Sequence, residues 1–231
     1  MKVIGLIGGM SWESSAMYYK IINQKTKEIL GQSHSCECVM YSVDFQTIAN
    51  LQHDGKWEEL GQIMAKTAQN LERSGADFIV LCTNTMHKLA ANIEQYCNIP
   101  LLHIADVTAE AILKKGLQKV ALLGTKFTME QDFLKGRLKE KHNIDTIIPN
   151  DAQREIIHRI IYEELVKGII LEESRTQYLS IIDDLTLRGA EGIILGCTEI
   201  GLLVTNEHTD NVLFDTTQIH AEAAVMLALN R

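Results

Sequence analysis

A repeat of one segment 114 residues further along constrains the fold of this chain more than any other feature. GADFIVLCTNT, at residues 75 to 85, matches GAEGIILGCTE, at residues 189 to 199, without a gap. Both copies read glycine, alanine and an acidic residue, then an apolar run, then small polar residues. This order is typical of a buried parallel strand that ends in a polar loop. The repeat therefore indicates a doubled unit, in which Thr83 stands at the position equivalent to Cys197.

Strand and helix patterns alternate along both halves of the chain. We expect strands over 2–8, 36–43, 77–82, 100–105, 119–124, 144–148, 192–196 and 211–215. Helices are expected over 11–30, 57–73, 86–96, 107–115, 128–141, 151–166, 171–188 and 217–230, with Ser11 and Thr85 as caps and Gly31 closing the first. Such alternation gives parallel sheets with right-handed crossovers. The predicted fold is α/β, with two pseudo-symmetric lobes that each hold a mostly parallel sheet flanked by helices.

Charge and composition narrow the classes of partner. The 231 residues carry a formal net charge of -8, so we expect neither nucleic acid nor an anionic membrane surface to bind. Met1 and Lys2 lead directly into an apolar strand pattern, without the features of a signal peptide or a membrane span, which favours a soluble cytoplasmic protein. The five cysteines are then expected to stay reduced. Cys36 and Cys38 lack a second pair at zinc-type spacing, so no metal is predicted.

Cys197 is the side chain best suited to act as a base or nucleophile. It follows the strand of the second repeat, where backbone N–H groups could lower the pKa of its thiol. The simpler interpretation is a small buried hydrophobe. The equivalent loop position of Thr83 favours function, whereas neighbouring Cys82 should point the opposite way, into the core. If the halves face each other across a pseudo-two-fold axis, Thr83 and Cys197 would flank one ligand.

The residues that follow these two side chains could bind a carboxylate. They are Asn84 and Thr85 in the first repeat, and Thr198 and Glu199 in the second. Their side chains and backbone groups could donate several hydrogen bonds, although helix capping would explain the same residue types. His87, one helical turn further on, could orient the first loop.

The segment GLIGGM, at residues 5 to 10, is rich in glycine and follows a strand pattern. Its spacing is not that of a dinucleotide-binding loop, and no Walker-type lysine follows it, so NAD and ATP sites are not predicted. We interpret Gly8, Gly9 and Met10 as a close approach of the backbone to a small ligand. A tight turn between strand and helix is the alternative.

Three motifs, GGMS at 8–11, TNTMH at 83–87 and GCTEIG at 196–201, resemble the aspartate/glutamate racemase family over nearly the whole chain. Within that family they resemble the L-aspartate/glutamate-specific members. The resemblance implies racemisation without a cofactor, in an active site between the lobes, where one residue from each lobe faces the α-carbon of an acidic amino acid. Both residues are usually cysteines, in C-N-T and G-C-T motifs. Cys197 fits the second motif, whereas Thr83 replaces the first cysteine, as it does in the L-specific members.

The same resemblance implies a set of substrate contacts and a division of the chain. The contacts are Met10, Gln52, Asn84, Thr85, Thr198 and Glu199. Lys126 is a candidate for the distal carboxylate by position only, and a solvated surface lysine is the simpler interpretation. The first lobe is expected to comprise residues 1–100 and 209–231, because the chain returns to it, and the second lobe residues 101–208. Exposed apolar surface on the helices would suit a homodimer.

Threonine in place of cysteine has a chemical consequence. A hydroxyl is a far weaker acid than a thiol and cannot rest as an alkoxide base. Cys197 should therefore carry most of the proton abstraction, while Thr83 donates a proton or relays one from water. The two directions of racemisation would then be unequal.

Two other functions are consistent with the same residues. A decarboxylase or a maleate-type isomerase of the same superfamily needs only one cysteine, since a carbanion would be protonated on one face. A two-lobed module that binds small acids without catalysis would need Cys197 only for packing. The first alternative predicts that Thr83→Cys racemises no faster, and the second predicts that Cys197→Ser changes nothing.

Overall fold

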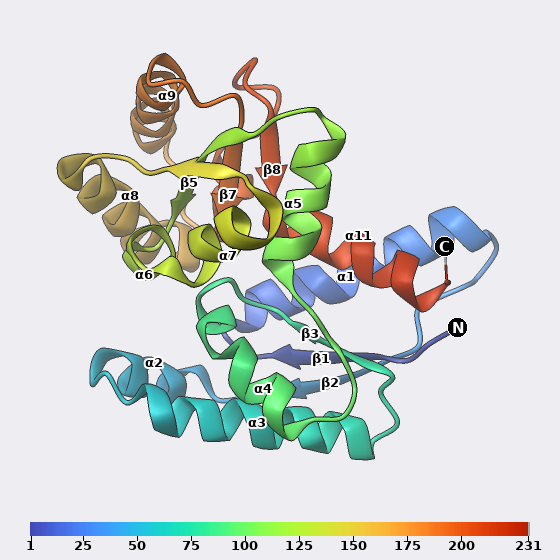
Figure 1. Cartoon of the computed structure of the whole chain (residues 1–231). Coiled ribbons are helices and arrows are strands. Elements are labelled where there is room, and N and C mark those ends of the chain that lie inside the picture. The colour runs from blue at the N-terminus through green and yellow to red at the C-terminus, as the bar shows by residue number, and fades with distance from the viewer. Residues whose placement is uncertain (231) are drawn as a thin grey trace. The chain divides into compact units, whose positions relative to one another are not determined.

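The computed structural model of the chain describes residues 1–230 (Figure 1). The chain divides into two compact units. Unit 1 comprises residues 1–104 and the residues from His220 onwards, and unit 2 comprises Ala105–Ile219. The return to unit 1 comes later than the boundary expected near residue 209, because Leu213–Asp215 forms a strand of the unit 2 sheet.

Unit 1 contains a four-stranded parallel sheet in the order β2-β1-β3-β4. The strands are β1 (Ile4–Gly8), β2 (Cys38–Ser42), β3 (Phe78–Leu81) and β4 (Leu101–Leu102). The helices are α1 (Trp12–Leu30), α2 (Phe45–His53), α3 (Trp57–Arg73), the 3₁₀-helix η1 (Thr85–Leu89), α4 (Ala90–Tyr96) and most of α11 (Thr216–Ala228). The central strands β1 and β3 pair with Ile7 opposite Leu81, so both end at the same edge. Ligands bind at this carboxyl edge in open α/β sheets.

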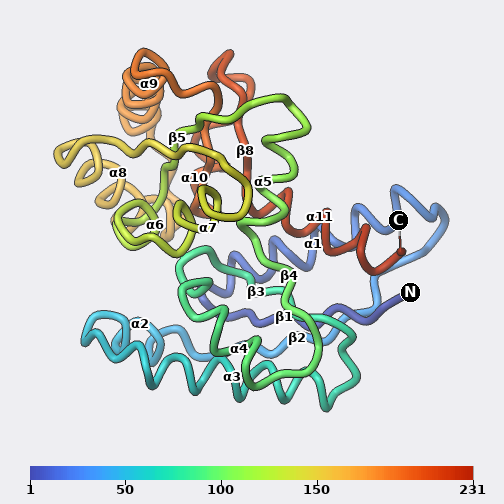
Figure 2. Tube along the Cα trace, viewed as in Figure 1, coloured from blue at the N-terminus to red at the C-terminus, as the bar shows by residue number. Residues whose placement is uncertain are grey.

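Helices cover both faces of the unit 1 sheet, as Figures 1 and 2 show. On one face α1 and α11 lie side by side, and their buried side chains pack against Leu6 and Val80. On the other face α2, α3 and α4 cover Ile7 and Leu81. Neighbouring residues of a strand point to opposite faces, so apolar residues at consecutive positions fill both cores.

Unit 2 repeats this arrangement with a parallel sheet in the order β6-β5-β7-β8. The strands are β5 (Lys119–Gly124), β6 (Asp145–Ile147), β7 (Ile193–Gly196) and β8 (Leu213–Asp215). The helices are α5 (Ile104–Lys114), α6 (Lys126–Glu130), α7 (Asp132–His142), α8 (Asp151–Glu163), η2 (Leu165–Lys167), α9 (Glu172–Leu187) and α10 (Ile200–Leu203). The prediction of an α/β fold with two parallel sheets flanked by helices is confirmed.

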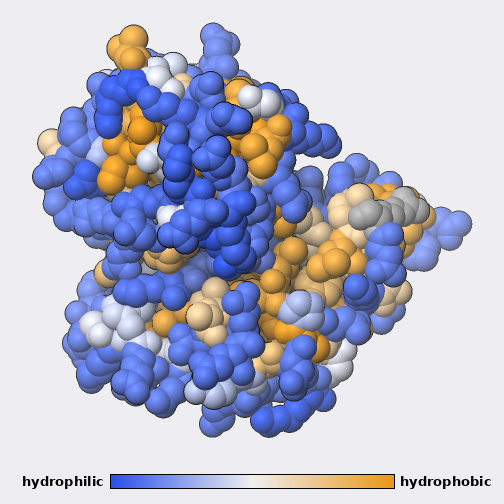
Figure 3. Space-filling view, viewed as in Figure 1, coloured by the Kyte–Doolittle hydropathy of each residue, from blue (hydrophilic) through white to orange (hydrophobic). Residues whose placement is uncertain are grey.

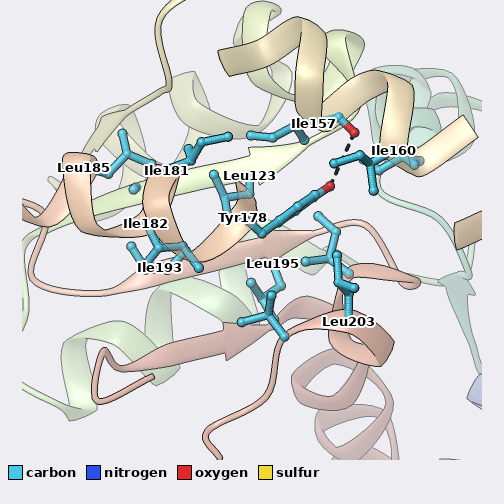
Figure 4. Close-up of a cluster of buried hydrophobic side chains, with 14 of the residues drawn as sticks. Leu123, Ile157, Ile160, Tyr178, Ile181, Ile182, Leu185, Ile193, Leu195 and Leu203 are labelled. Carbon is cyan, nitrogen blue, oxygen red and sulfur yellow. Dashed lines mark hydrogen bonds between the residues drawn. The ribbon is translucent and has the colours of Figure 1, made fainter. Parts of the chain in front are cut away.

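The largest core cluster of unit 2 lies between its sheet and helices α8, α9 and α10 (Figure 4). Leu123 and Leu195 contribute from the strands. Tyr178 of α9 is completely buried among them, and its hydroxyl donates a hydrogen bond of 3.3 Å to the carbonyl of Ile157 in α8. A buried hydroxyl needs such a partner, because losing water without replacement is costly.

Two short helices were not predicted. The first of them, α2, begins after Asp44, whose carboxylate caps the helix by accepting a hydrogen bond from the Thr47 N–H. This cap is a standard N-terminal signal, but the helix that follows is short and buries only Ile48 and Leu51. The four residues of α10 are also too few to show a helical period.

The strand expected over 100–105 is reduced to β4, because α5 begins at Ile104 and not at residue 107. Two further expected helices begin or divide differently. The helix expected over 86–96 starts as the 3₁₀-helix η1, so Thr85 is its first residue instead of its cap. The helix expected over 128–141 consists of α6 and α7, which are separated by Gln131 in an extended conformation. Local backbone geometry, which apolar spacing does not report, accounts for both differences.

On the face that Figure 3 shows, most surface residues are hydrophilic, and hydrophobic residues gather in separate patches. Exposed large hydrophobic side chains include Trp12 in α1 and Leu187 in α9. Among residues 1–230, no helix combines the length and the apolar character needed to cross a bilayer.

Candidate active site

The candidate residues of unit 1 lie in the loops that follow β1 and β3. These strands are neighbours, so the loop with Met10 and the loop with Thr83 leave the same edge of the sheet. Thr83 is half-buried, whereas Cys82 is completely buried in the core beneath the sheet. Burial raises the pKa of the Cys82 thiol far above its usual range. Cys82 is therefore a core residue, as predicted from the alternation of side chains along the strand.

Two serines at the start of α1 hold these loops. The Ser14 hydroxyl donates to the carbonyl of Cys82 at 2.9 Å, and the Ser15 hydroxyl accepts from the N–H of Gly9 at 2.7 Å. Ser11 caps the helix by accepting from the Ser14 N–H, as predicted. The beginning of α1 thus fastens the loop after β1 to the loop after β3.

The glycines of the first loop are explained by contacts within the protein. Gly9 has a φ of 91°, and a Cβ there would lie 2.2 Å from the carbonyl oxygen of Val43. A Cβ on Gly8 would lie 2.6 Å from the Ser15 hydroxyl. The tight turn between β1 and α1, the alternative interpretation of this segment, is therefore sufficient to explain both glycines.

The remaining predicted residues of unit 1 surround the same edge. Gln52, from the unpredicted helix α2, donates from Nε2 to the sulfur of Met86 at 3.0 Å, which places it beside the loop after β3. Asn84 is buried and Thr85 is half-buried in that loop. Met10 is buried in the apolar cluster that also contains Met86. Packing is therefore a sufficient role for Met10.

In unit 2, Cys197 directly follows β7. Gly196 at the end of β7 pairs with Gly124 at the end of β5, so the loops after these strands also leave one edge of the sheet. Cys197 and Thr198 are half-buried, and Glu199 is buried. The carbonyl of Cys197 accepts from the Ile200 N–H at 3.2 Å, where α10 begins.

The thiol of Cys197 lies within hydrogen-bonding distance of a carboxylate. Its Sγ lies 3.0 Å from Oε2 of Glu199, in position to donate a hydrogen bond. Burial and then the negative charge of Glu199 raise the pKa of the thiol well above its usual range. Backbone hydrogen bonds from Glu199 and Thr198 act in the opposite direction, as the sequence predicted, but are outweighed. Cys197 thus rests as a neutral thiol, and a nearby carboxylate can accept its proton.

Two residues of α8, His158 and Tyr162, lie near Cys197 and its neighbours and were not predicted. Tyr162 keeps 36% of its surface exposed, and its pKa is raised to about 12, first by partial burial and then by the charge of Cys197 once its thiol has ionised and by the charge of Glu199. Its ring lies 4.6 Å from that of His158, and Nδ1 of His158 accepts from the N–H of Lys126 at 3.4 Å. The spacing of four residues that places His158 and Tyr162 on one helix face was the available signal.

Lys126 lies at the beginning of α6, in the loop that follows β5. Its ammonium forms an ion pair with the carboxylate of Glu155, which is largely exposed. The side chain is about one third exposed. This ion pair matches the simpler interpretation of Lys126 better than a role in binding a ligand.

The described residues define one set of candidate groups in each unit. Thr83, Asn84, Thr85 and Gln52 lie at the carboxyl edge of the first sheet, and Cys197, Thr198 and Glu199 lie at that of the second. No group of three or more His, Cys, Asp or Glu within residues 1–230 is arranged to hold a metal ion. The chemistry available is proton donation by a hydroxyl and proton exchange through a thiol and a carboxylate.

Known proteins resemble this chain over almost its full length. A protein-family model described as Asp/Glu/Hydantoin racemase matches residues 7–224. The crystal structure of a Yersinia pestis protein assigned as an Asp/Glu racemase is 53% identical with a TM-score of 0.95, covering 99% of this chain and 100% of that one. An aspartate racemase homologue from Pyrococcus horikoshii OT3 is 36% identical with a TM-score of 0.88, at the same coverage. The broad specificity amino-acid racemase RacX of Bacillus subtilis (strain 168) is 23% identical over 96% of each chain.

Proposed function

Because the chain belongs to the Asp/Glu/hydantoin racemase family and is therefore an isomerase, we propose that it interconverts the enantiomers of aspartate and glutamate without a cofactor. Thr83 and Cys197 would exchange protons with opposite faces of the α-carbon. The single observation that carries this proposal is the hydrogen bond from the Cys197 thiol to Glu199, at the loop position that the repeat makes equivalent to Thr83.

Cys197 acts together with Glu199 in the proposed reaction. As the sulfur receives the α-proton, the proton that it already carries passes to Oε2 of Glu199. The thiol is restored, the carboxylate becomes a carboxylic acid, and the substrate becomes a carbanion. Reversal of these transfers protonates the same face. A positioned acid or base of this kind contributes a factor of roughly 10² to 10⁴ to a rate.

Thr83 would donate a proton to the other face of the α-carbon. Its hydroxyl donates to the carbanion and recovers a proton from water, since an alkoxide cannot persist at neutral pH. The proton held by Glu199 then neutralises the hydroxide that remains, which restores both residues. Racemisation has an equilibrium constant of one, so kcat/KM must be equal for the two enantiomers. The unequal chemistry of hydroxyl and thiol would appear as different kcat values, compensated by different KM values.

The α-proton of an amino acid is removed only if the negative charge that develops on its carboxylate is stabilised. The backbone N–H groups and side chains of Asn84, Thr85 and Thr198 are the proposed donors. Preorganised donors of this kind supply several kcal/mol in enzymes. Gln52, which lies beside the same loop through Met86, is a further proposed contact.

Two variants test the assignment of roles. Cys197→Ser should abolish racemisation of both acids, because a hydroxyl replaces the only thiol of the pair. Thr83→Cys should raise kcat for the slower direction, measured by chiral chromatography of the products. If Thr83→Cys racemises no faster and the wild type releases carbon dioxide from malonates, the one-cysteine decarboxylase is favoured instead.

A further inference from the structure

Three histidines are buried together beneath the Thr83 loop in unit 1. His87, His103 and His220 are exposed by 2%, 4% and 0%. The ring of His87 lies 4.7 Å from that of His103 and 5.7 Å from that of His220. Buried imidazoles need specific hydrogen-bond partners, because burial without them is costly. The partners of His87 connect this cluster to the candidate site.

The hydrogen bonds of His87 define which of its nitrogens carries a proton. The N–H of Ile104 donates to Nε2 at 3.2 Å, so this nitrogen is an acceptor. A neutral imidazole then carries its proton on Nδ1. Nδ1 lies 2.8 Å from the carbonyl oxygen of Thr83 and donates to it. Both ring nitrogens are therefore used by backbone groups.

The carbonyl of Thr83 is available to His87 because η1 is a 3₁₀-helix. In an α-helix, the N–H of residue 87 would donate to the carbonyl four residues earlier, which is that of Thr83. In η1 it donates to the carbonyl of Asn84 at 3.1 Å. The imidazole takes the place of the missing backbone donor. It thereby holds the peptide that follows Thr83 in one orientation.

The other nitrogen binds the segment where the chain leaves unit 1. Ile104 is the last residue of unit 1 before the chain enters unit 2. His220, the first residue after the chain returns, is also hydrogen-bonded to this segment, through Nε2 and the carbonyl of Leu102 at 2.8 Å. The orientation of the Thr83 loop is thus linked, through one side chain, to the exit segment of unit 1.

From these contacts we infer that His87 is a positioning residue for Thr83, through donation from Nδ1 to the Thr83 carbonyl while Nε2 is anchored on Ile104. This inference rests on the proposed function for its catalytic consequence. The imidazole does not touch the substrate. It keeps the Thr83 hydroxyl at the angle needed to protonate one face of the α-carbon.

The geometry itself is tested independently of activity. The ¹⁵N chemical shifts of the imidazole nitrogens, in protein labelled at histidine, report which nitrogen is protonated. We expect a neutral His87 with the proton on Nδ1, and a neutral His220 with the proton on Nε2. A His87 that carries its proton on Nε2, or on both nitrogens, would overturn the inference.

Two substitutions separate the two hydrogen bonds of His87. The amide nitrogen of Asn can occupy the place of Nδ1 and donate to Thr83, while the amide oxygen of Gln can occupy the place of Nε2 and accept from Ile104. His87→Asn keeps the contact that the inference needs, and His87→Gln keeps the other. Thr83→Ala serves as the reference for complete loss of the Thr83 step.

The measurement starts from each enantiomer separately, in deuterated buffer. It compares the rate at which deuterium replaces the α-proton with the rate at which the other enantiomer appears. Exchange without inversion needs only Cys197, whereas inversion also needs Thr83. His87→Gln should raise the ratio of exchange to inversion by about tenfold or more for the enantiomer that Cys197 deprotonates, as Thr83→Ala does, and His87→Asn should stay near the wild type. A purely structural role would lower exchange and inversion together and leave the ratio unchanged.

The failures of the two proposals are distinguishable. An unchanged ratio in His87→Gln, or a larger change in His87→Asn, would overturn the role of His87 while racemisation by the wild type upholds the proposed function. If the wild type neither exchanges nor inverts aspartate or glutamate, the proposed function fails. The position of Thr83 can then still be tested without activity. If His87 holds Thr83, the ¹⁵N shifts show the proton on Nδ1, and the Thr83 resonances change in His87→Gln but not in His87→Asn.

Discussion

At the scale of single residues, the state of Cys197 is the most informative feature of the candidate site. Its sequence setting suggested a thiolate stabilised by backbone N–H groups. The structure shows those hydrogen bonds but also burial and the charge of Glu199, and together these raise the thiol pKa. The thiol therefore stays protonated at neutral pH, with its sulfur 3.0 Å from a carboxylate oxygen. In the proposed reaction it acts as both acid and base, and Glu199 takes up the second proton.

The Glu199 carboxylate raises the pKa of the thiol and is also the proposed proton acceptor. The variant Glu199→Gln tests both effects. Removing the charge of the carboxylate should lower the pKa of the Cys197 thiol, because a nearby negative charge disfavours the thiolate. The rate of alkylation against pH, taken as the difference between proteins with and without Cys197→Ser, should shift to lower pH. The same variant should lose roughly 10²-fold in α-proton exchange, since the proton acceptor is gone. Unchanged exchange would show that the sulfur needs no partner.

Gly9 is a second residue with a defined physical role. Gly9→Ala should destabilise the protein strongly, because φ is 91° and the new Cβ would meet the Val43 carbonyl oxygen at 2.2 Å. Gly75 has the same φ of 91° with nothing within 4 Å of a Cβ, so Gly75→Ala measures the backbone strain alone, about 1–2 kcal/mol. Urea unfolding should give a clearly larger loss for Gly9→Ala. Equal losses would mean that the loop moves to accept the methyl group.

At the scale of secondary-structure elements, apolar periodicity predicted the strands and the long helices. The apolar runs of β3 and β7 and the three- and four-residue spacing in α3 record burial, which is what periodicity detects. Apolar periodicity did not predict α2, which buries few residues. Nor did it predict the 3₁₀ geometry of η1, in which the Thr83 carbonyl accepts from the His87 side chain and not from a backbone N–H. Tyr162 joined the surroundings of Cys197 unpredicted, because α8 and the β7 loop meet only in three dimensions.

Some residues of the candidate site could be predicted from the sequence, and others depend on contacts that form only in the fold. Thr83 and Cys197 could be chosen from the sequence, because the repeat placed them at equivalent loop positions. The partner of the thiol could not, since the 3.0 Å approach of Glu199 Oε2 to the sulfur depends on the turn that follows β7, which the sequence pattern does not define. Gln52 was chosen by resemblance alone, and only α2 explains how it reaches the loop after β3.

The attachment of α11 to unit 1 should depend on pH. Burial lowers the pKa of His220 from 6.5 to about 4, and its Nδ1 accepts from the Tyr18 hydroxyl at 2.9 Å. The unfolded chain binds this proton more readily, so the associated stability is fully present above about pH 6.5 and is lost as pH falls towards 4.

This loss amounts to roughly 2 kcal/mol between pH 7.5 and pH 5. The decrease in urea-unfolding free energy over this range should be smaller by about that amount in His220→Gln, which does not titrate. The wild-type and variant slopes would coincide if His220 kept its ordinary pKa in the folded protein.

At the scale of the whole molecule, the chain is one α/β unit used twice. Both sheets have the same strand order, with the first strand of each unit paired to the second and the third. The repeat provides two equivalent loops, which carry chemically different side chains at Thr83 and Cys197. A hydroxyl in one and a thiol with its carboxylate in the other suit a reaction with two unlike protonation steps.

The most direct test is proton NMR of L-aspartate and L-glutamate in deuterated buffer with purified, pyridoxal-free protein, followed by polarimetry of the same samples. We predict loss of the α-proton signal together with decay of optical rotation, and neither change with Cys197→Ser. Retention of the α-proton of both acids by the wild-type protein would contradict it.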